Sequence, residues 1–317
     1  MAPLSLHHIM PKNPLIVWRI IDDKMGHLNQ SRGLVRALAN YTAIKSFDLH
    51  APSRLSSLGS WLLGRFSQAD SLPDPDFIIG AGHGTHLALL AARRARGGKI
   101  IVLGKPSLSP ACFNLCVTPL GDDLPAAENV LHTWGVLNII DPSRQRRADQ
   151  GLFLIGGPSG SHGWNDHEII EQLLEIVTQQ SAVNWIVTTS RRTPDGFIRK
   201  LSKVQKTNLT IVPHDQTHDD WVPRQLSLSS QAWVSEDSVS MVYEALTSGA
   251  AVGLLTVPAK RQGRVTRGMQ TLQAGGWVTG FADWDRSRPL PPPPGELHEA
   301  RRCAELICER YQLPRAA

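Results

Sequence analysis

The sequence lacks the features that mark several large classes of protein. Residues 1–13 carry no long apolar run, so we expect neither a signal peptide nor a membrane-spanning helix. The chain has four cysteines, and no pair of them has the two-residue spacing of a zinc knuckle or a redox motif. We therefore expect reduced, partly buried cysteines in a cytoplasmic protein.

Charge of one sign is only slightly in excess. The 33 Lys and Arg residues against 28 Asp and Glu give a formal net charge of +5. This balance suits an anionic partner, such as a nucleotide phosphate or an acidic membrane surface, or else a solvated basic face without any partner. There is no long basic run and no recognised nucleic-acid motif, so we do not expect nucleic acid binding.

What the chain does contain is an alternation of short apolar runs with helical periodicity. Its 317 residues suffice for two domains, and this rhythm is typical of parallel α/β sheets. A polar, Arg-rich stretch at 141–150 predicts a linker between two Rossmann-like domains, 1–145 and 146–317. The predicted strands are 15–21, 43–49, 77–79, 100–103, 152–155, 185–188, 209–212, 232–235 and 251–255. Two predicted helices end near residues 38 and 96. Three more cover 166–180, 238–248 and 296–310. Asp166 is the expected N-cap of the helix 166–180, and Gly249 is expected to end the helix 238–248.

A glycine-rich loop at 156–163 follows the first predicted strand of the second domain. Its four glycines allow close approach of the backbone, and successive N–H groups can hold phosphate oxygens near a helix N-terminus. The alternative is a flexible turn. The loop 156–163 is not a P-loop, because it does not end in Gly-Lys-Ser/Thr. The loop 80–85 has the pattern G-x-G-x-G, which differs from the spacing of a dinucleotide-binding fingerprint. We assign phosphate or sugar contact to Gly156, Gly157, Ser159, Gly160 and Ser161.

Two further segments of the second domain carry groups suited to a nucleotide. Ser190 and Arg191 follow a predicted strand, and the arginine fork matches phosphate geometry, although such arginines can also simply face solvent. Glu236 lies at a predicted strand end, and Glu244 lies eight residues later, inside the next helix. This E-x7-E arrangement is found in many GT-B glycosyltransferases. The first carboxylate would reach the sugar, the second would bind ribose hydroxyls, and the helix start around Ser238 and Ser240 would face the diphosphate. The alternative is a capped helix with one solvated glutamate.

The first domain offers two candidate features. His27 follows the first strand in a Gly-His turn, and it can hold a phosphate, act as a base, or only cap the turn. Residues 54–66 form an amphipathic pattern with flanking arginines, which suits either packing on the domain's own sheet or peripheral docking on a membrane. The apolar stripe consists of Leu55, Leu58, Trp61, Leu62 and Phe66.

Together these segments resemble the mitochondrial-fission Elm family of plant and bacterial proteins. The matching stretches are 22–30, 80–86, 156–164, 188–193 and 235–249, spread over roughly residues 15–285. The resemblance implies a GT-B-like architecture with a nucleotide sugar in the cleft between the two domains. We do not transfer organelle fission to this chain, because we identify no organelle-targeting segment in it.

We expect a metal-independent glycosyltransferase, because Asp22-Asp23 and Asp219-Asp220 are adjacent pairs without the Asp-x-Asp spacing of metal-dependent transferases. His27 and Glu236 are the candidate catalytic residues, and a nucleotide sugar serves as donor substrate with no other cofactor. The acceptor is unknown and is either lipid-linked or free, and the protein works in the cytoplasm or on the inner face of the membrane. The alternatives are a nucleotide-sugar epimerase on the same architecture and a non-catalytic GT-B-like scaffold that binds a membrane or a protein.

Overall fold

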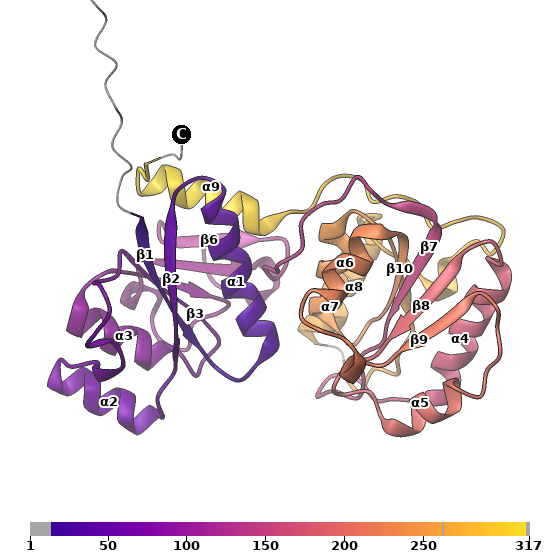
Figure 1. Ribbon diagram of the computed structural model, residues 1–317, viewed down its shortest axis with the longest axis horizontal. Coiled ribbons are helices and arrows are strands. Elements are labelled where there is room, and N and C mark those ends of the chain that lie inside the picture. Colours follow the sequence, from indigo (N-terminus) through magenta and orange to yellow (C-terminus); the bar gives the residue numbers. More distant parts are fainter. Residues whose placement is uncertain (1–13, 262, 315–317) are drawn as a thin grey trace, which may run out of the picture. The chain divides into compact units, whose positions relative to one another are not determined.

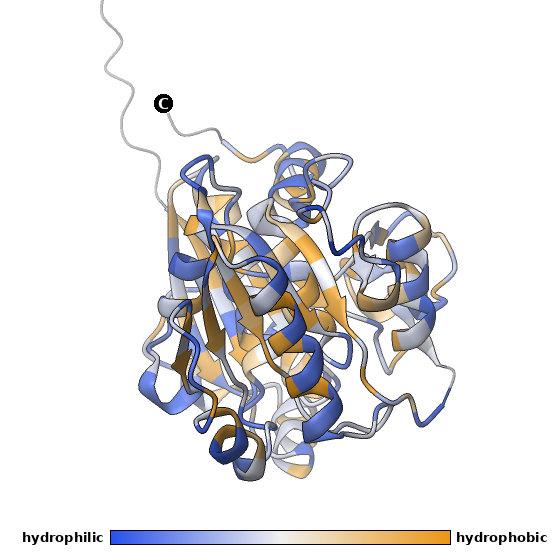
Figure 2. Ribbon diagram, turned by 90° about the vertical axis from the view of Figure 1, so that its right-hand side faces the viewer, coloured by the Kyte–Doolittle hydropathy of each residue, from blue (hydrophilic) through white to orange (hydrophobic). Residues whose placement is uncertain are grey.

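The computed structural model describes residues 14–261 and 263–314, and the chain divides into two compact units. The first unit comprises Met1–Leu137 and Glu299–Ala317, and the second comprises Asn138–His298. Each unit contains a six-stranded parallel sheet with helices on its faces (Figure 1). Figure 2 shows that the strands are mainly hydrophobic, whereas the helices carry hydrophobic and hydrophilic residues side by side.

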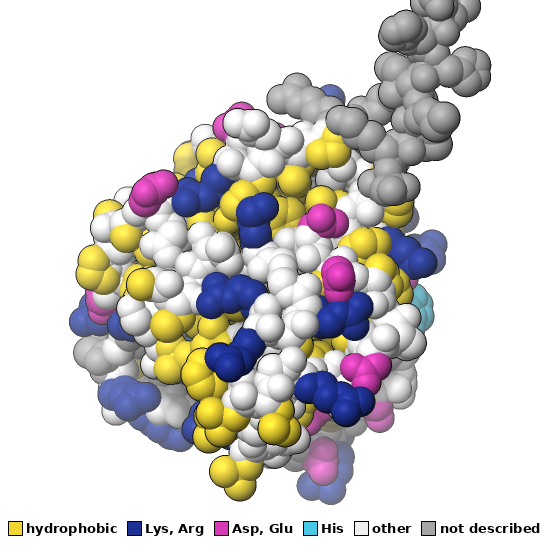
Figure 3. Space-filling model, turned by 90° about the vertical axis from the view of Figure 1, so that its left-hand side faces the viewer, with side chains coloured by type: hydrophobic (Ala, Val, Ile, Leu, Met, Phe, Trp, Pro, Cys, Tyr) yellow, Lys and Arg dark blue, Asp and Glu magenta, His cyan; other side chains and the backbone are white. Residues whose placement is uncertain are grey.

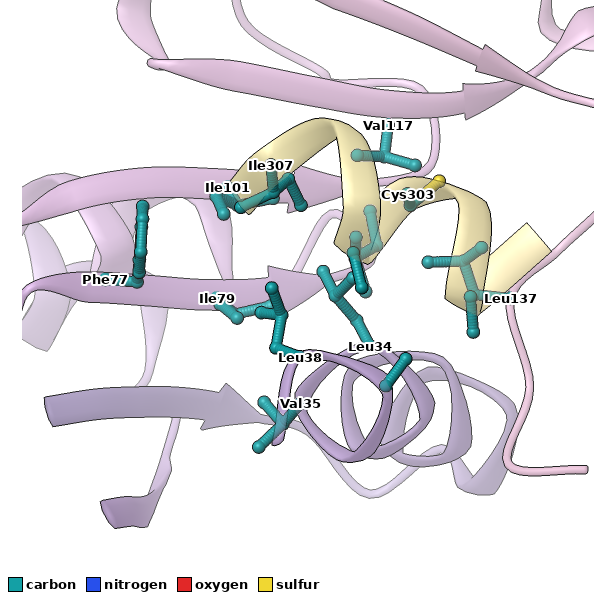
Figure 4. Packing of buried hydrophobic residues seen from close by; sticks show 14 of the residues in the cluster. Leu34, Val35, Leu38, Phe77, Ile79, Ile101, Val117, Leu137, Cys303 and Ile307 are labelled. Carbon is teal, nitrogen blue, oxygen red and sulfur yellow. The ribbon is translucent and has the colours of Figure 1, made fainter. Parts of the chain in front are cut away.

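The sheet of the first unit has the strand order β2-β1-β3-β4-β5-β6. The strands are β1 Leu15–Ile21, β2 Ile44–His50, β3 Phe77–Ala81, β4 Lys99–Leu103, β5 Leu115–Pro119 and β6 Val130–Thr133. The helices are α1 Met25–Ala39, α2 Arg54–Leu63, α3 His86–Arg96 and α9 Glu299–Arg310. Helices α1 and α9 cover one face, where Leu38 and Ile307 pack with Ile79 and Ile101 (Figure 4). On the other face, α3 packs against Trp18 and its neighbours.

The sheet of the second unit has the strand order β12-β11-β10-β7-β8-β9. The strands are β7 Arg147–Leu154, β8 Asn184–Thr188, β9 Leu209–Val212, β10 Ser229–Ser235, β11 Ala251–Leu255 and β12 Thr279–Gly280. The helices are α4 Asp166–Gln179, α5 Asp195–Leu201, α6 Trp221–Leu228, α7 Val239–Ser248 and α8 Arg264–Ala274. Because the central strands are buried on both faces, side chains as large as Trp185 and Trp233 are almost completely enclosed.

The predicted parallel α/β class is confirmed, and the predicted strands all exist. Gly249 ends α7 in the left-handed conformation at φ 79°, as expected of a helix-terminating glycine. The predicted linker 141–150 is partly wrong, because β7 already begins at Arg147. The N-cap of α4 is Asn165 and not Asp166, since the Asn165 side chain accepts the N–H of His167. Strands β5, β6 and β12 and helices α5, α6 and α8 were not predicted.

The terminal helix α9 lies in the first unit, although we expected it in the second domain. Its apolar face, with Ala300, Cys303, Ala304 and Ile307, belongs to the core under α1. The chain thus returns to the first unit at Glu299, and the second unit begins at Asn138 rather than at 146. All four cysteines are free, and Cys116, Cys303 and Cys308 are buried. Within the described residues, no helix is long and apolar enough to cross a membrane.

Candidate functional site

The loops that follow β11, β10, β7 and β8 form the candidate site of the second unit. These four strands are neighbours in one parallel sheet, so their carboxyl ends lie along the same edge. The predicted segments 156–161, 190–191 and 236–240 all lie on these loops or at the first turn of α7. The structure therefore brings together the segments that the sequence placed in one site.

Asp237 joins three of these loops at the centre of the edge. Its side chain is completely buried, and Oδ2 accepts the N–H of Gly157 at 3.0 Å and Nη2 of Arg192 at 2.8 Å. Arg192 also donates to the carbonyl oxygens of Gly157 at 2.6 Å and Pro158 at 3.2 Å. A Cβ on Gly156 would lie 2.3 Å from Asp237 Oδ2, so the carboxylate fills the space that this glycine leaves.

The first part of the glycine loop is bonded to protein groups. The N–H of Gly156 donates to Ser235 Oγ at 2.7 Å, and Ser190 Oγ donates to the carbonyl oxygen of Gly156 at 3.0 Å. A Cβ on Gly157 would lie 2.1 Å from the carbonyl oxygen of Arg192. The N–H groups of Gly156 and Gly157 thus donate to the side chains of Ser235 and Asp237, and neither is available to a phosphate in this structure.

The second part of the loop forms a small closed turn. Ser159 Oγ accepts the N–H groups of Ser161 at 3.3 Å and His162 at 3.0 Å. Lys260, which follows β11, donates its backbone N–H to Ser161 and its Nζ to the carbonyl oxygen of Ser159. Gly160 is exposed at the tip, and within the described residues its N–H has no protein acceptor. Contact between this tip and a ligand stays a prediction.

Glu236 follows β10 directly and is half-buried. Its Oε1 accepts the N–H of Val257 at 2.9 Å. Burial raises the pKa of the Glu236 carboxyl, and the neighbouring Asp237 adds to this rise, while the Val257 hydrogen bond and the nearby His162 oppose it. A carboxyl that retains its proton more readily than usual is suited to acid–base chemistry.

The start of α7 presents free backbone donors beside Glu236. The preceding Ser238 makes no side-chain capping bond, and the first turn, which contains Ser240, has no acidic residue. The first N–H groups of an α-helix have no acceptor within the helix, and they attract anions together with the helix dipole. Glu244 lies in the second turn of α7 and is partly exposed. The predicted placement of the two glutamates is confirmed, whereas their contact with a ligand stays a prediction.

The two arginines after β8 differ in their environment. Arg192 is held by Asp237, whereas Arg191 is exposed and has no hydrogen bond or ion pair with any residue in the described part of the chain. The predicted ligand contact, Arg191, therefore presents an uncompensated guanidinium at the site.

His27 of the first unit forms a pair with Asp22. Its Nδ1 lies 2.8 Å from Asp22 Oδ2, so the carboxylate accepts the Nδ1 proton and leaves Nε2 as the basic nitrogen. Gly82, at φ 81°, lies against the imidazole, and a Cβ there would be 2.1 Å from His27 Cε1. This glycine is therefore required both by its backbone angle and by the close approach of the ring.

His86, at the start of α3, is a further buried histidine of the first unit. Burial lowers its pKa to about 4, and His83 and His27 contribute to the decrease. Its Nδ1 accepts the N–H of Ser107 at 3.2 Å and lies 2.7 Å from Ser107 Oγ. His86 is thus neutral near pH 7.

Sequence reasoning missed four polar residues of these sites, which are Asp22, His86, His162 and Asp237, and it preferred Arg191 to the neighbouring Arg192. All of these except His86 lie within five residues of a predicted site residue, so position after a strand was the available signal for them. Within residues 14–261 and 263–314, no group of three or more His, Cys, Asp or Glu side chains is placed to hold a metal ion.

Comparisons with known proteins bear on family and fold. Residues 25–311 match the family model described as mitochondrial fission ELM1, and no curated protein sequence matches significantly. A protein assigned as UDP-N-acetylglucosamine 2-epimerase from Listeria monocytogenes has a TM-score of 0.61 at 12% identity, over 95% of this chain and 97% of that one. The UDP-GlcNAc 2-epimerase from Neisseria meningitidis, solved with UDP-GlcNAc, has a TM-score of 0.51 at 11% identity, over 94% of this chain and 100% of that one. At such identities the likeness shows the fold alone, which is two Rossmann-like units of the GT-B type.

Proposed function

The chain belongs to the mitochondrial fission ELM1 family, and from this premise we propose that its second unit binds a nucleotide-activated sugar and promotes a reaction of that sugar. The observation that carries the proposal is the start of α7. There, free helix N–H groups adjoin a carboxyl with a raised pKa and lie on the same sheet edge as an unpaired arginine.

Each group has a distinct part in the proposed complex. The diphosphate accepts hydrogen bonds from the N–H groups of the first turn of α7, which contains Ser240 and where the helix dipole favours negative charge. The N–H of the preceding Ser238 already donates to the carbonyl oxygen of Ser235. Arg191 compensates the diphosphate charge, which grows when the diphosphate departs as the leaving group. Glu244 accepts hydrogen bonds from the ribose hydroxyls, and Glu236 contacts the sugar. The Neisseria protein, which shares the fold, was solved with UDP-GlcNAc, which supports a ligand of this class.

Glycosyl transfer is the reaction that we propose first. A general base takes the proton of an acceptor hydroxyl, and that oxygen forms the new bond to the anomeric carbon. His27 of the first unit, oriented by Asp22, is our candidate base through Nε2. The bond from the anomeric carbon to the diphosphate breaks, and the diphosphate leaves with the electron pair. The proposal includes a lipid-linked acceptor and a place on the inner face of the membrane.

Epimerisation of the nucleotide sugar is the second candidate. It requires acid–base groups at a single site and no acceptor. We take His162 of the second unit as the partner of Glu236 in this reaction, since its nearby imidazole opposes the rise in the pKa of the Glu236 carboxyl. Several structural relatives named as UDP-N-acetylglucosamine 2-epimerases have this fold.

Ligand binding and turnover can be tested separately. Thermal unfolding with UDP, UDP-GlcNAc and other nucleoside diphosphate sugars should show stabilisation, about 2.7 kcal/mol at one hundred times Kd. Glu244→Ala and Arg191→Gln should weaken binding, while Arg199→Gln, an exposed arginine on α5 of the same unit, should not. If no nucleotide sugar stabilises the protein, the proposal is wrong.

The products then separate the reactions. Release of nucleoside diphosphate only when an acceptor is present indicates transfer, and inversion at one sugar carbon without acceptor indicates epimerisation. Binding with neither reaction indicates a non-catalytic scaffold, and it would overturn the proposed catalysis.

A further inference from the structure

Helix α2 of the first unit exposes its leucines, and its one buried residue is a serine. Within α2, all of which is described, Ser57 is the only buried residue. Leu55, Leu62 and Leu63 are 83%, 62% and 82% exposed. At about 100° per residue, these leucines and Leu58 lie on the side of the helix that faces away from Ser57. An amphipathic helix that stabilises its own domain has the opposite arrangement.

The core beneath α2 is closed without these leucines. Phe66 and Ala69, which follow the helix, are 2% and 0% exposed and pack in the core on this side of the sheet. The predicted stripe was therefore wrong at Phe66, which is a core residue. The helix itself lies against α3, and the leucines contribute exposed apolar surface that the fold of the unit does not use.

Arginine side chains lie beside this surface. Residues 53–66 contain Arg54 and Arg65 and no acidic residue. Arg65 pairs with Asp70 at 3.1 Å. The guanidinium of Arg94 on α3 lies 4.9 Å from the ring centroid of Trp61, at the edge of the leucine face. Figure 3 shows hydrophobic side chains near the lower edge of the face that carries α2 and α3, with Lys and Arg side chains close by.

We propose that the α2 face docks the first unit on the surface of an anionic lipid bilayer. We define the α2 face as Leu55, Leu58, Trp61, Leu62 and Leu63. The leucines enter the boundary between head groups and acyl chains, and Trp61 lies at head-group depth, as tryptophan does in membrane interfaces. Arg54 and Arg94 approach lipid phosphates, which supply the opposite charge. With 10 residues, α2 lies in the interface and does not span it.

Vesicle sedimentation tests this docking. We expect wild-type protein to sediment with phosphatidylcholine vesicles that contain phosphatidylglycerol and to bind pure phosphatidylcholine more weakly. The double variant Leu62→Ser with Leu63→Ser should bind anionic vesicles at least about tenfold more weakly, because two large side chains no longer enter the bilayer. Leu120→Ser is the matched control, since Leu120 is an exposed leucine of the same unit outside α2 and should leave binding unchanged.

A second measurement reports on α2 directly. Brominated lipids should quench part of the tryptophan fluorescence of the wild type, and Trp61→Phe should remove that quenched part. Absence of vesicle binding by the wild type, or unchanged binding by the double variant, would overturn the proposal. So would a wild-type dimer that the double variant converts to a monomer without vesicle binding, because the face would then join two copies.

The docking rests on the membrane location in the proposed function, but it is independent of the proposed sugar chemistry. The α2 variants should keep the thermal stabilisation by nucleotide sugars, since that ligand is assigned to the second unit. Failure of vesicle binding with intact nucleotide binding therefore counts against the membrane alone.

Discussion

Replacing Asp237 by Asn should destabilise the second unit without changing its shape. The carboxylate is fully buried and accepts two hydrogen bonds, one from Gly157 N–H and one from Arg192. The Gly157 bond changes from a charged acceptor, worth about 1.5–3 kcal/mol, to a neutral one, worth about 0.5–1.5, and so loses about 1 kcal/mol. The Arg192 bond keeps its charged donor and loses only the attraction between two opposite charges. Because the Arg192 side chain is 40% exposed, water offsets part of this loss. We expect a decrease of about 1–2 kcal/mol in the free energy of unfolding.

Urea denaturation followed by tryptophan fluorescence measures this loss. Six of the nine tryptophans lie in the second unit, so the signal reports mainly on that unit. Asp237→Ala should lose more, about 3–5 kcal/mol, because it leaves the Gly157 N–H and the Arg192 charge without their partner. Asp149→Asn, in an exposed pair with Arg147, should lose no more than about 1 kcal/mol. An Asp237→Asn midpoint equal to that of the wild type would refute the stabilising role of Asp237.

Two further substitutions test residues that follow strands, namely Glu236 after β10 and Gly82 after β3. Because the pKa of Glu236 is raised in the folded protein, the folded protein binds a proton at Glu236 more tightly than the unfolded chain does. The protonated Glu236 therefore stabilises the fold most below the ordinary pKa of 4.5, and this stabilisation declines as pH rises through the raised pKa. Glu236→Gln should remove this decline and unfold at higher urea than the wild type at neutral pH; identical pH dependence of the two proteins would contradict it. Gly82→Ala, at positive φ and against the His27 ring, should cost about 1–3 kcal/mol of stability in thermal unfolding. Gly26→Ala is the control: Gly26 lies in the first turn of α1 with open space around it, so this variant should be neutral or stabilise by up to about 1 kcal/mol. Equal melting temperatures of Gly82→Ala and Gly26→Ala would show that the His27 ring does not constrain residue 82.

Hydrophobic periodicity was sufficient to predict most of the sheet strands and several helices. The strands 209–212 and 251–255 coincide with β9 and β11, because each is an apolar run between turn residues. Strands β5 and β6 were missed, since they are short and include Thr, His or Pro. The terminal helix was recognised but assigned to the wrong unit. Periodicity reveals that a helix has an apolar face, but it does not reveal which core receives that face.

The part of the candidate site that follows the strands could be predicted from the sequence. Glu236 and Arg191 were identified because parallel sheets gather such positions at one edge. The role of Asp237 was not predictable, although it is adjacent to Glu236. Its burial and its bond to Arg192 depend on how loops from three strands meet, and nothing in the local sequence encodes that meeting.

The polar groups of the second unit's edge fall into two sets, and this division decides where a ligand can bind. One set is occupied by protein partners, as with the N–H groups of Gly156 and Gly157 and the guanidinium of Arg192. The other set comprises the Arg191 guanidinium and the free N–H groups at the start of α7. A diphosphate that displaced the first set would have to break bonds to a buried carboxylate, which is costly, whereas binding to the second set would not require that loss. Substitution of Gly157 therefore tests the folding of the loop, and substitution of Arg191 tests the binding of phosphate.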